Sequence, residues 1–582
     1  MRLFMRHKVI PVVVIVVLIL VLGGGYAGKY LYDKYSYSNE QADAKSYFGI
    51  EDENDVPIIL QNEKSDLHAR LIDGVYYMTF SDVQNILNDR FYYGQEEGIL
   101  VYTTPSAIIT VGVDSTTTSS TDGSSEDLGY KAAVYDNDTL YVAIDYVKKY
   151  TNFNYTAYTD PNHITMYTQF DQEIRAVIKK STKLRLRGGV KSEILVGLEK
   201  GDTVVLLEKL EDWSKVVSPD GYIGYVENKF LENIQTVDLL APSDYAEPVY
   251  TSVHLDGKVN LVWHSIGGKA GNDTLSSAIS NTSGLNVISP TWFSLSDNEG
   301  SIESFATQGY VDTAHANGMQ VWAALDNFNN SNFHNGEGST AKVLASSTSR
   351  KRLIDSLMSE VRTYGIDGIN VDLEFTGSSL EDITADGGED YIEFIRELSI
   401  ACRAEGTILS VDIPVPMGNS FFHRKELGVV CDYVIIMAYD EHYEGSAEAG
   451  SVASISYVEN GIKNTLEDVP ADKLVNGIPF YTRIWFTSTD GTVKSQAGGM
   501  SWANSYISSN GIDMNWDQET CQYYGTYTQS DGTVVEIWLE DAESIQTKLN
   551  VMDVNGCAGV AAWQLGYETS DIWPVIEAYV NK

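Results

Sequence analysis

The chain has few cysteines for its length. Its 582 residues include only Cys402, Cys431, Cys521 and Cys557, with no C-x-x-C pair and no regularly spaced framework among them. This scarcity argues against a disulfide scaffold and against a structural zinc site. Cys431 and Cys557 open apolar strands, so we expect buried free thiols at these positions.

Basic residues are also scarce. Lys and Arg number 40 against 81 Asp and Glu, which gives a net charge of −41 at pH 7 and a pI near 4.4. Such an acidic surface repels nucleic acid and anionic membrane surfaces, so we exclude both as partners of the folded part. At roughly 150 residues per domain, the length predicts about four domains. Aromatic residues are plentiful, with 37 Tyr and 10 Trp. They either fill the core or form platforms on which sugars stack, and composition leaves both interpretations open.

Residues 1–40 form a basic tip, an apolar segment and a stalk. Arg2, Arg6 and Lys8 precede an apolar run over Val9–Gly28, which at about 20 residues is long enough to span a bilayer. The basic tip predicts a cytoplasmic N-terminus. We therefore expect an uncleaved signal anchor in the cell membrane, with the bulk of the chain extracytoplasmic. Cleavage after Ala27 would instead secrete the protein.

Residues 41–170 are predicted to form a small α+β domain. A strand, a short helix and a strand are expected at 74–79, 81–87 and 98–103, and the same order recurs at 139–143, 144–149 and 163–167. This recurrence indicates an internal duplication. Residues 113–129 are rich in Ser, Thr and Asp, and we expect a flexible loop there. The order resembles the small N-terminal-type domain of copper amine oxidases, a resemblance that implies no copper here.

Residues 172–235 have the short strands and turn glycines of a small β-barrel. The spacing from Leu184-Arg through Trp213-Ser-Lys-Val to Gly221-Tyr-Ile-Gly-Tyr-Val resembles a bacterial SH3-type domain. Trp213, Tyr222 and Tyr225 are either core residues or the lining of a groove for wall peptide or glycan, and the sequence leaves both open. Residues 236–250 carry two prolines and are predicted to be a linker.

Residues 251–582 alternate apolar strands with helical stretches. The strands number eight, which is the count of a (β/α)8 TIM barrel, and lie at 259–263, 285–289, 320–325, 368–374, 407–412, 433–437, 474–479 and 559–563. Arg350–Val361 has the apolar spacing of an amphipathic helix. The stretch from Arg483 to Met552 is too long for one crossover helix. We therefore predict an inserted α+β subdomain at about 486–550.

The stretch from Tyr364 to Glu374, Tyr-Gly-Ile-Asp-Gly-Ile-Asn-Val-Asp-Leu-Glu, contains the strongest functional signal. As a strand it places Asn370, Asp372 and Glu374 on one face, because strand side chains alternate. Buried carboxylates are costly unless they are paired or used. The stretch resembles the signature of glycoside hydrolase family 18, Asp-Gly-x-Asp-x-Asp-x-Glu, with Asn370 in place of an aspartate. The resemblance covers about residues 258–582.

That resemblance implies a mechanism in which the substrate takes part. Glu374 would protonate the glycosidic oxygen, and Asp372 would orient the 2-acetamido group whose carbonyl attacks C1. Tyr439 would hydrogen-bond the acetamido group, supported by Asp440, and Trp563 would form the floor beneath the sugar. The anomeric configuration would be retained. The chemistry needs no metal and no cofactor.

The carboxyl ends of the barrel strands should carry the substrate-binding residues, because active sites of such barrels lie there. The side chains at these ends are acids, amides and aromatics, as a sugar cleft requires. The candidates for substrate binding are Asn327, Asn370, Met437, Trp292, Tyr481 and Trp563.

Several segments resemble one branch of the family, the spore-cortex-lytic N-acetylglucosaminidases. They are 326–328, 437–446, 452–458, 537–541 and 562–568. The sequence thus predicts an extracytoplasmic, monomeric peptidoglycan N-acetylglucosaminidase. The alternatives are a chitinase acting on chitooligosaccharides, or a non-catalytic wall-glycan-binding protein. The expected partners are peptidoglycan or another GlcNAc-containing glycan, a wall peptide or glycan at the SH3-type domain, and the membrane at the N-terminal helix.

Overall fold

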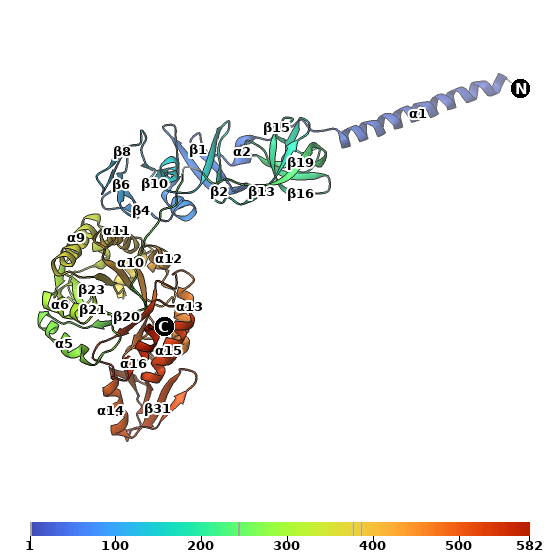
Figure 1. Ribbon diagram of the computed structural model, residues 1–582. Coiled ribbons are helices and arrows are strands. Elements are labelled where there is room, and N and C mark those ends of the chain that lie inside the picture. Colours follow the sequence, from blue (N-terminus) through green and yellow to red (C-terminus); the bar gives the residue numbers. More distant parts are fainter. Residues whose placement is uncertain (1–2, 243–244, 376, 386) are drawn as a thin grey trace. The chain divides into compact units, whose positions relative to one another are not determined.

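The computed structural model describes residues 3–242, 245–375, 377–385 and 387–582. They divide into two compact units. The first comprises Met1–Phe91, Val111–Thr117 and Glu126–Glu247, and the second comprises Tyr92–Thr110, Thr118–Ser125 and Pro248–Lys582 (Figure 1). Each unit is described by itself.

The second unit is built on a closed barrel of parallel strands. In barrel order its strands are β20 (Val259–His264), β33 (Gly559–Trp563), β27 (Leu474–Pro479), β26 (Tyr433–Met437), β25 (Ile408–Pro414), β24 (Gly368–Asp372), β23 (Gln320–Asp326) and β21 (Val287–Leu295). Pairing of β20 with β21 closes the ring. The short β22 (Ile302–Ser304) adds antiparallel to β21. All eight strands predicted from the apolar runs are confirmed.

Buried side chains fill both sides of the barrel wall. Leu261, Trp322 and Ile435 belong to one apolar cluster, whereas Val262 and Ile288 belong to a second cluster that also contains helix residues. Strand side chains alternate between faces, so one set fills the barrel and the other packs under the helices. The helices are α6 (Gln308–Ala316), α8 (Thr340–Ala345), α9 (Ser347–Tyr364), α10 (Gly377–Ala385), α11 (Glu389–Glu405), α12 (Arg424–Val430), α13 (Ile455–Thr465), α15 (Ala542–Val554) and α16 (Ile572–Val580).

Helix α9 is the predicted amphipathic helix and leads into β24. The Ser346 hydroxyl accepts a hydrogen bond from the backbone N–H of Ser349 and caps its start. Gly365 ends it with a φ of +70°, a left-handed conformation that glycine adopts without strain. The chain then turns directly into the strand that carries Asn370 and Asp372.

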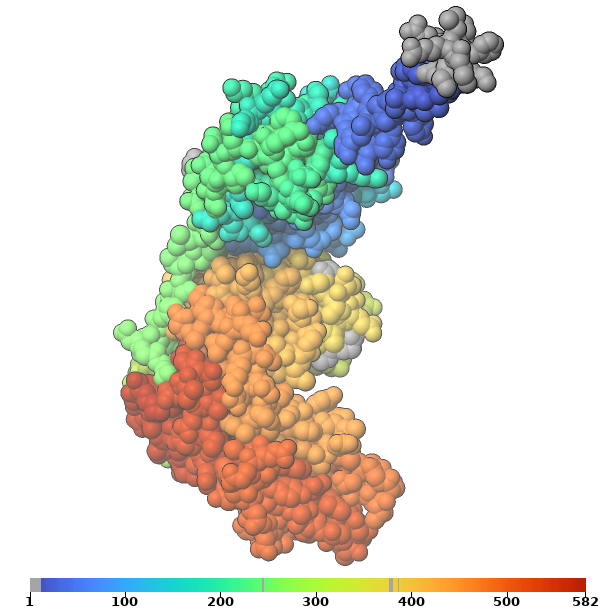
Figure 2. Space-filling view, turned by 90° about the vertical axis from the view of Figure 1, so that its right-hand side faces the viewer, coloured from blue at the N-terminus to red at the C-terminus, as the bar shows by residue number. Residues whose placement is uncertain are grey.

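A second sheet is inserted between β27 and α15. Its order is β29 (Val493–Gly499), β28 (Tyr481–Thr487), β32 (Val534–Leu539), β31 (Gln522–Thr528) and β30 (Met514–Asp517), and it carries α14 (Met500–Asn510). Figure 2 shows the orange-red residues of this subdomain projecting from the catalytic unit. The subdomain spans Tyr481–Leu539, whereas the sequence predicted about 486–550. Its end comes earlier than predicted because α15 is the crossover helix that returns the chain to β33.

The first unit contains two seven-stranded sheets. One has the order β11 (Asn154–Thr159), β12 (Asn162–Tyr167), β1 (Asp55–Leu60), β2 (Glu63–Ile72), β3 (Val75–Thr79), β10 (Thr139–Ala143) and β9 (Ala133–Asp136). The other, the SH3-type barrel, has the order β15 (Ile194–Leu198), β14 (Thr182–Arg185), β18 (Ile223–Glu227), β17 (Trp213–Val217), β16 (Thr203–Lys209), β13 (Gln172–Ile178) and β19 (Leu231–Asp238).

The predicted repeat is visible only in part. The strands β3 and β10 pair with each other, and each is followed by a short helix, at Phe80–Leu87 and at α4 (Ile144–Lys148). The last strands of the two predicted copies lie in different sheets. β12 lies in the seven-stranded sheet, whereas β5 (Ile99–Thr103) belongs to a separate sheet. That sheet has the order β4 (Phe91–Gly94), β5, β6 (Ile108–Gly112), β7 (Thr117–Ser120) and β8 (Ser125–Asp127).

The flexible loop expected at 113–129 is wrong, because β7 and β8 lie within it. β7 consists of Thr and Ser, and β8, Ser-Glu-Asp, is exposed along its whole length. An exposed edge strand needs no apolar period, so composition could not distinguish it from a loop.

The N-terminal helix α1 runs from Leu3 to Tyr35. Within it Val12–Tyr35 has a mean hydropathy of 2.3 in its most apolar window and none of that window is buried, so it is long and apolar enough to cross a membrane. After α1 the chain continues to the short helix α2 (Ala44–Phe48), whose Phe48 lies in the core of the SH3-type barrel. The predicted stalk is therefore held against that barrel.

Candidate active site

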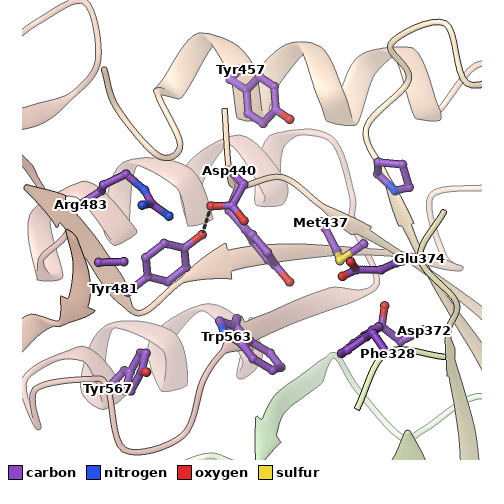
Figure 3. A pocket seen from close by; sticks show the side chains of 13 residues that line it. Phe328, Asp372, Glu374, Met437, Asp440, Tyr457, Tyr481, Arg483, Trp563 and Tyr567 are labelled. Atoms are coloured by element: carbon purple, nitrogen blue, oxygen red, sulfur yellow. Dashed lines mark hydrogen bonds between the residues drawn. The ribbon is translucent and has the colours of Figure 1, made fainter. Parts of the chain in front are cut away.

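A pocket of about 520 Å³ opens at the carboxyl ends of the barrel strands (Figure 3). Most of the predicted site residues line it, namely Asp372, Glu374, Met437, Tyr439, Asp440, Tyr481 and Trp563. Figure 3 shows Glu374 and Asp372 on one side beside Met437 and Phe328, with Tyr481 and Tyr567 on the other and Trp563 between them. The remaining lining residues are Pro414, Tyr457, Arg483 and Ala497.

Asp372 is the last residue of β24 and is only 9% exposed. Its Oδ1 atom has no hydrogen-bond partner within the described part of the chain. Burial raises the pKa of Asp372 well above its ordinary value, and the negative charges of Asp412, Glu374 and Asp326 raise it further. Asp372 therefore lines the pocket with one carboxyl oxygen that is both unpaired and closed to solvent.

Glu374 lies two residues beyond Asp372 and reaches the pocket. Its backbone is fixed by Asn327, whose Oδ1 accepts from the Glu374 N–H at 3.0 Å and whose Nδ2 donates to the Glu374 carbonyl at 2.8 Å. The side chain keeps access to solvent, but the pocket walls still desolvate its carboxyl. This desolvation, followed by the charges of Asp440 and Asp326, raises the pKa of Glu374. A carboxyl with a raised pKa can act as a general acid at mildly acidic to neutral pH.

Asn327 is predicted to bind substrate, but the structure assigns it to the support of Glu374. It is buried, and its Nδ2 also donates to the Thr340 hydroxyl at 2.9 Å. It is absent from the pocket lining. Asn327 thus fixes the backbone at Glu374 from outside the pocket.

Asn370 is fully buried beneath the pocket and does not line it. Its Oδ1 accepts from Trp263 Nε1 at 2.9 Å and from Ser289 Oγ at 3.1 Å. Its Nδ2 donates to Ser410 Oγ at 3.0 Å and to Asp412 Oδ1 at 2.8 Å. All four hydrogen-bonding positions of the amide are therefore used, and Asn370 is not placed to contact a substrate.

Asp412 lies on β25 and is not among the residues predicted for the site. Its side chain is buried, Oδ1 accepts from Asn370, and Oδ2 has no partner among the described residues. Desolvation raises the pKa of Asp412 to about 8, although hydrogen bonds from Asn370 and Trp263 oppose this rise. Asp412 is also the first charged neighbour that raises the pKa of Asp372. The charge of the buried Asp412 thus acts on the carboxyl that lines the pocket.

Tyr439, Asp440 and Tyr481 form one wall of the pocket. The Tyr481 hydroxyl donates to Asp440 Oδ1 at 2.6 Å, and the rings of Tyr439 and Tyr481 meet edge to face with centroids 6.3 Å apart. Burial raises the pKa of the Tyr439 hydroxyl well above its ordinary value, as does the nearby charge of Asp372. Tyr439 therefore keeps its proton and can donate it in a hydrogen bond.

The two tryptophans predicted to bind sugar differ in position. Trp563 lines the pocket, and its ring lies 6.2 Å from that of Trp263. Trp292 is fully buried in the apolar core, where its Nε1 donates to Asn272 and its ring packs against Tyr310. It is not available to a sugar, because β21 extends past Trp292 to Leu295 and turns this ring toward α6.

Sequence reasoning missed several lining residues in this pocket. Arg483 lies two residues beyond Tyr481 on β28, so strand alternation would have placed both on one face. Phe328 stands in a segment that resembles the cortex-lytic branch, although it was not proposed as a site residue. Tyr457 on α13 and Tyr567 after β33 also stand in segments of this kind, 452–458 and 562–568, and were likewise not proposed as site residues.

Comparisons with known proteins identify two families in the chain. The model of the family described as "Glycosyl hydrolases family 18" matches residues 260–568, and that of "Bacterial SH3 domain" matches residues 180–232. The chain is 26% identical over 247 residues to the cortical fragment-lytic enzyme of Bacillus subtilis (strain 168), covering 41% of this chain and 56% of that protein. It is 25% identical over 255 residues to chitotriosidase-1 of Mus musculus, covering 38% and 54%.

Among solved structures, the chain is similar to the Bacillus cereus spore cortex-lytic enzyme SleL, with a TM-score of 0.49, 21% identity, and coverage of 57% of this chain and 75% of that one. The chain spans little more than half the length of the two sequence relatives. The matched residues 260–568 make up more than half of the 582 residues and contain every residue that lines the pocket. The chain therefore belongs to the glycosyl hydrolases of family 18.

Proposed function

We propose that the protein hydrolyses β-1,4-linked N-acetylglucosamine glycans outside the cytoplasm, with peptidoglycan as its substrate. The observation that carries this proposal is the pairing of Glu374, a carboxyl with a raised pKa at the pocket, with Asp372, a buried carboxyl that lines the same pocket. One group can give a proton and the other can accept a hydrogen bond, which are the two roles that a substrate-assisted glycosidase needs.

In this proposal Glu374 protonates the glycosidic oxygen while the 2-acetamido carbonyl of the sugar attacks C1. The bond from C1 to the leaving oxygen breaks, and the acetamido N–H donates to Asp372 as positive charge develops. The Tyr439 hydroxyl donates to the acetamido oxygen, and the Asp440–Tyr481 pair shapes this wall. Water then attacks C1 and gives its proton to Glu374, so the configuration is retained. Trp563 supports the sugar ring from below.

Three further observations favour peptidoglycan as the substrate. One relative is named a cortical fragment-lytic enzyme. An SH3-type domain precedes the barrel, and the apolar segment Val12–Tyr35 can hold the chain in a membrane that faces the wall. A chitinase remains the second candidate because chitotriosidase-1 matches a similar share of the chain.

Digestion of purified peptidoglycan by the full chain in detergent tests the proposal. The wild type should release products with a reducing-end N-acetylglucosamine, identified by mass spectrometry after reduction. Glu374→Gln should lower the rate at least roughly a hundredfold, because it removes the general acid. Glu444→Gln, an exposed glutamate outside the pocket lining, is the matched control and should leave the rate unchanged.

Three other results would contradict the proposal in different ways. Release of short oligomers from chitin with no products from peptidoglycan would identify a chitinase. No products from either glycan would identify a wall-binding protein without activity. Wild-type rates from a folded Glu374→Gln variant would remove Glu374 as the acid.

A further inference from the structure

One half of the Asp440–Tyr481 wall of the catalytic pocket has a strained backbone. Asp440 has a φ of +56°, in the left-handed region that is costly for a residue with a Cβ atom. Such a conformation persists only where the surrounding structure holds it. The Tyr481 hydroxyl provides one such contact (Figure 3). Because Asp440 follows the barrel strand β26 and Tyr481 begins the inserted subdomain, this contact depends on how the two parts are joined.

A fully buried ion pair lies where the inserted subdomain returns to the barrel. Glu540, the residue after β32, is 0% exposed, and Lys548 on α15 is 1% exposed. Lys548 Nζ donates to Glu540 Oε1 at 3.0 Å and to Oε2 at 2.9 Å. Gln522 Nε2 also donates to Oε1, at 2.7 Å, and Ser544 Oγ donates to Oε2, at 2.8 Å. Each carboxylate oxygen thus has two partners, which offsets the cost of burying the charge.

The first connection from this ion pair runs to the strand of Tyr481. The backbone N–H of Glu540 donates to the hydroxyl of the buried Thr482 at 3.0 Å. The pairing of β28 with β32 ends at Ile484, so this hydrogen bond fastens the start of β28 beyond that ladder. Thr482 stands between Tyr481 and Arg483, which both line the catalytic pocket.

The second connection runs to the loop of Asp440. The Ser451 hydroxyl donates to Gln522 Oε1, so Gln522 joins Ser451 to the Glu540 carboxylate, and both side chains are buried. The carbonyl of the residue after Ser451 accepts from the Glu441 N–H at 2.9 Å, which closes the loop directly after Asp440. One buried carboxylate is therefore connected to both halves of the wall.

We propose that the Glu540–Lys548 ion pair and Gln522 are positioning residues of the active site. They hold the Asp440–Tyr481 wall together across the junction between the barrel and the inserted subdomain. None of the three lines the pocket, so they act through the two chain segments that carry the wall. This inference rests on the proposed glycan hydrolysis, because it assigns the wall a role in that reaction.

The position of Asp440 also affects the acid. Among the neighbouring charges, that of Asp440 raises the pKa of Glu374 most, and that of Asp326 on β23 follows. The other carboxyls that interact with Glu374 are Asp372 on β24 and Asp412 on β25. If the wall moves away, the pKa of Glu374 falls and the acid loses its proton at a lower pH. Breaking the network should therefore move the alkaline limb of kcat/KM toward lower pH.

Kinetics of the full chain in detergent test this inference, with a nitrophenyl glycoside of di-N-acetylchitobiose as the soluble probe. Gln522→Met breaks the link to the Asp440 loop and leaves the ion pair in place. It should lower kcat/KM by about tenfold, the scale of one lost buried hydrogen bond, and should move the alkaline limb to lower pH. If this variant does not fold, Thr482→Val, which breaks the other connection, decides in its place.

Two controls separate positioning from stability. Val535→Ala removes apolar volume from the core of the inserted subdomain, so it should lower the unfolding temperature and leave the alkaline limb in place. Gln518→Met, at an exposed glutamine of the same subdomain, should change neither. An alkaline limb that stays in place in Gln522→Met, or that moves equally in Val535→Ala, would overturn the positioning role.

Hydrogen exchange measured by mass spectrometry separates this inference from the proposed function, since it needs no activity. The amides of residues 440–452 and 481–483 should exchange faster in Gln522→Met than in the wild type, whereas those of β33 should not change. This pattern in a wild type that does not cleave glycans would reject the proposed hydrolysis and still support the connection between the network and the wall. Unchanged exchange in both segments would overturn the connection, whatever the activity.

Discussion

Asn370 shows how one amide organises the floor of the catalytic pocket. At this position the amide donates to Asp412 while it accepts from Trp263 and Ser289. A carboxylate could make the same acceptor contacts, but it could donate to Asp412 only in its protonated form. With an uncharged amide at position 370, the neighbouring charge that raises the pKa of Asp372 most is that of Asp412, one strand away.

The raised pKa of Asp412 predicts a stability that depends on pH. Its folded-state pKa of about 8 lies above the unfolded value of 3.8, so its ionisation opposes folding, and stability is lost as pH rises between these values. Asp412→Asn removes this titration while keeping an acceptor for Asn370. The unfolding temperature of the variant relative to the wild type should therefore be higher at pH 8 than at pH 5, as measured by differential scanning calorimetry.

The control for this prediction is Asp513→Asn, at an exposed aspartate of the inserted subdomain. Its unfolding temperature relative to the wild type should not change between pH 5 and pH 8. If the unfolding temperatures of the wild type and of Asp412→Asn change in parallel from pH 5 to pH 8, Asp412 does not titrate in this range.

At the scale of elements, the apolar runs were sufficient to predict every strand of the barrel. Strands buried on both faces are continuous apolar segments, so β26 and β33 stand out against the polar helices around them. Alternation likewise placed Asp372 and Glu374 together. What could not be predicted depends on contacts far apart in sequence, such as the support of Glu374 by Asn327 and the burial of Trp292.

One such contact joins β4 to the barrel helices within the second unit. Arg350 on α9 is fully buried and donates to Glu397 at 2.9 Å, to the Leu344 carbonyl at 2.6 Å and to the Tyr92 hydroxyl at 3.2 Å. Tyr92 also donates to Asp390 at 2.6 Å. Residues far upstream of the predicted barrel boundary at 251 are therefore part of the catalytic unit.

Breaking this cluster should destabilise the catalytic unit. Arg350→Met leaves Glu397 buried without its cation, a change that costs about 3–5 kcal/mol for pairs of this kind. The neighbouring Lys351→Met is the matched control, because Lys351 pairs with Asp355 on the surface, where such pairs are worth about 0.5 kcal/mol or less. Denaturant unfolding should show a large loss for the first variant and almost none for the second. Equal small losses would mean that Glu397 is protonated or solvated without Arg350.

At the scale of the whole molecule, charge and hydrophobicity are distributed unevenly along the chain. The net charge of −41 belongs almost wholly to the folded units, whereas Val12–Tyr35 contains the only helix long and apolar enough to span a membrane among the described residues. The folded units should be repelled by an anionic membrane surface. An apolar helix that spans the bilayer would hold them close to it in spite of this repulsion.

The whole chain should therefore remain in the membrane fraction with its first helix intact. After expression in a Gram-positive host and an alkaline carbonate wash, we expect the protein in the pellet, with an intact mass that includes residues 12–35. Leu18→Lys combined with Leu20→Lys should release it or block its export, since each charge at the centre of a span costs about 2.5–3.5 kcal/mol. Leu240→Lys, at an exposed position outside the span, should neither release the protein nor block its export.

A mature chain in the medium that begins at Gly28 would instead establish cleavage after Ala27.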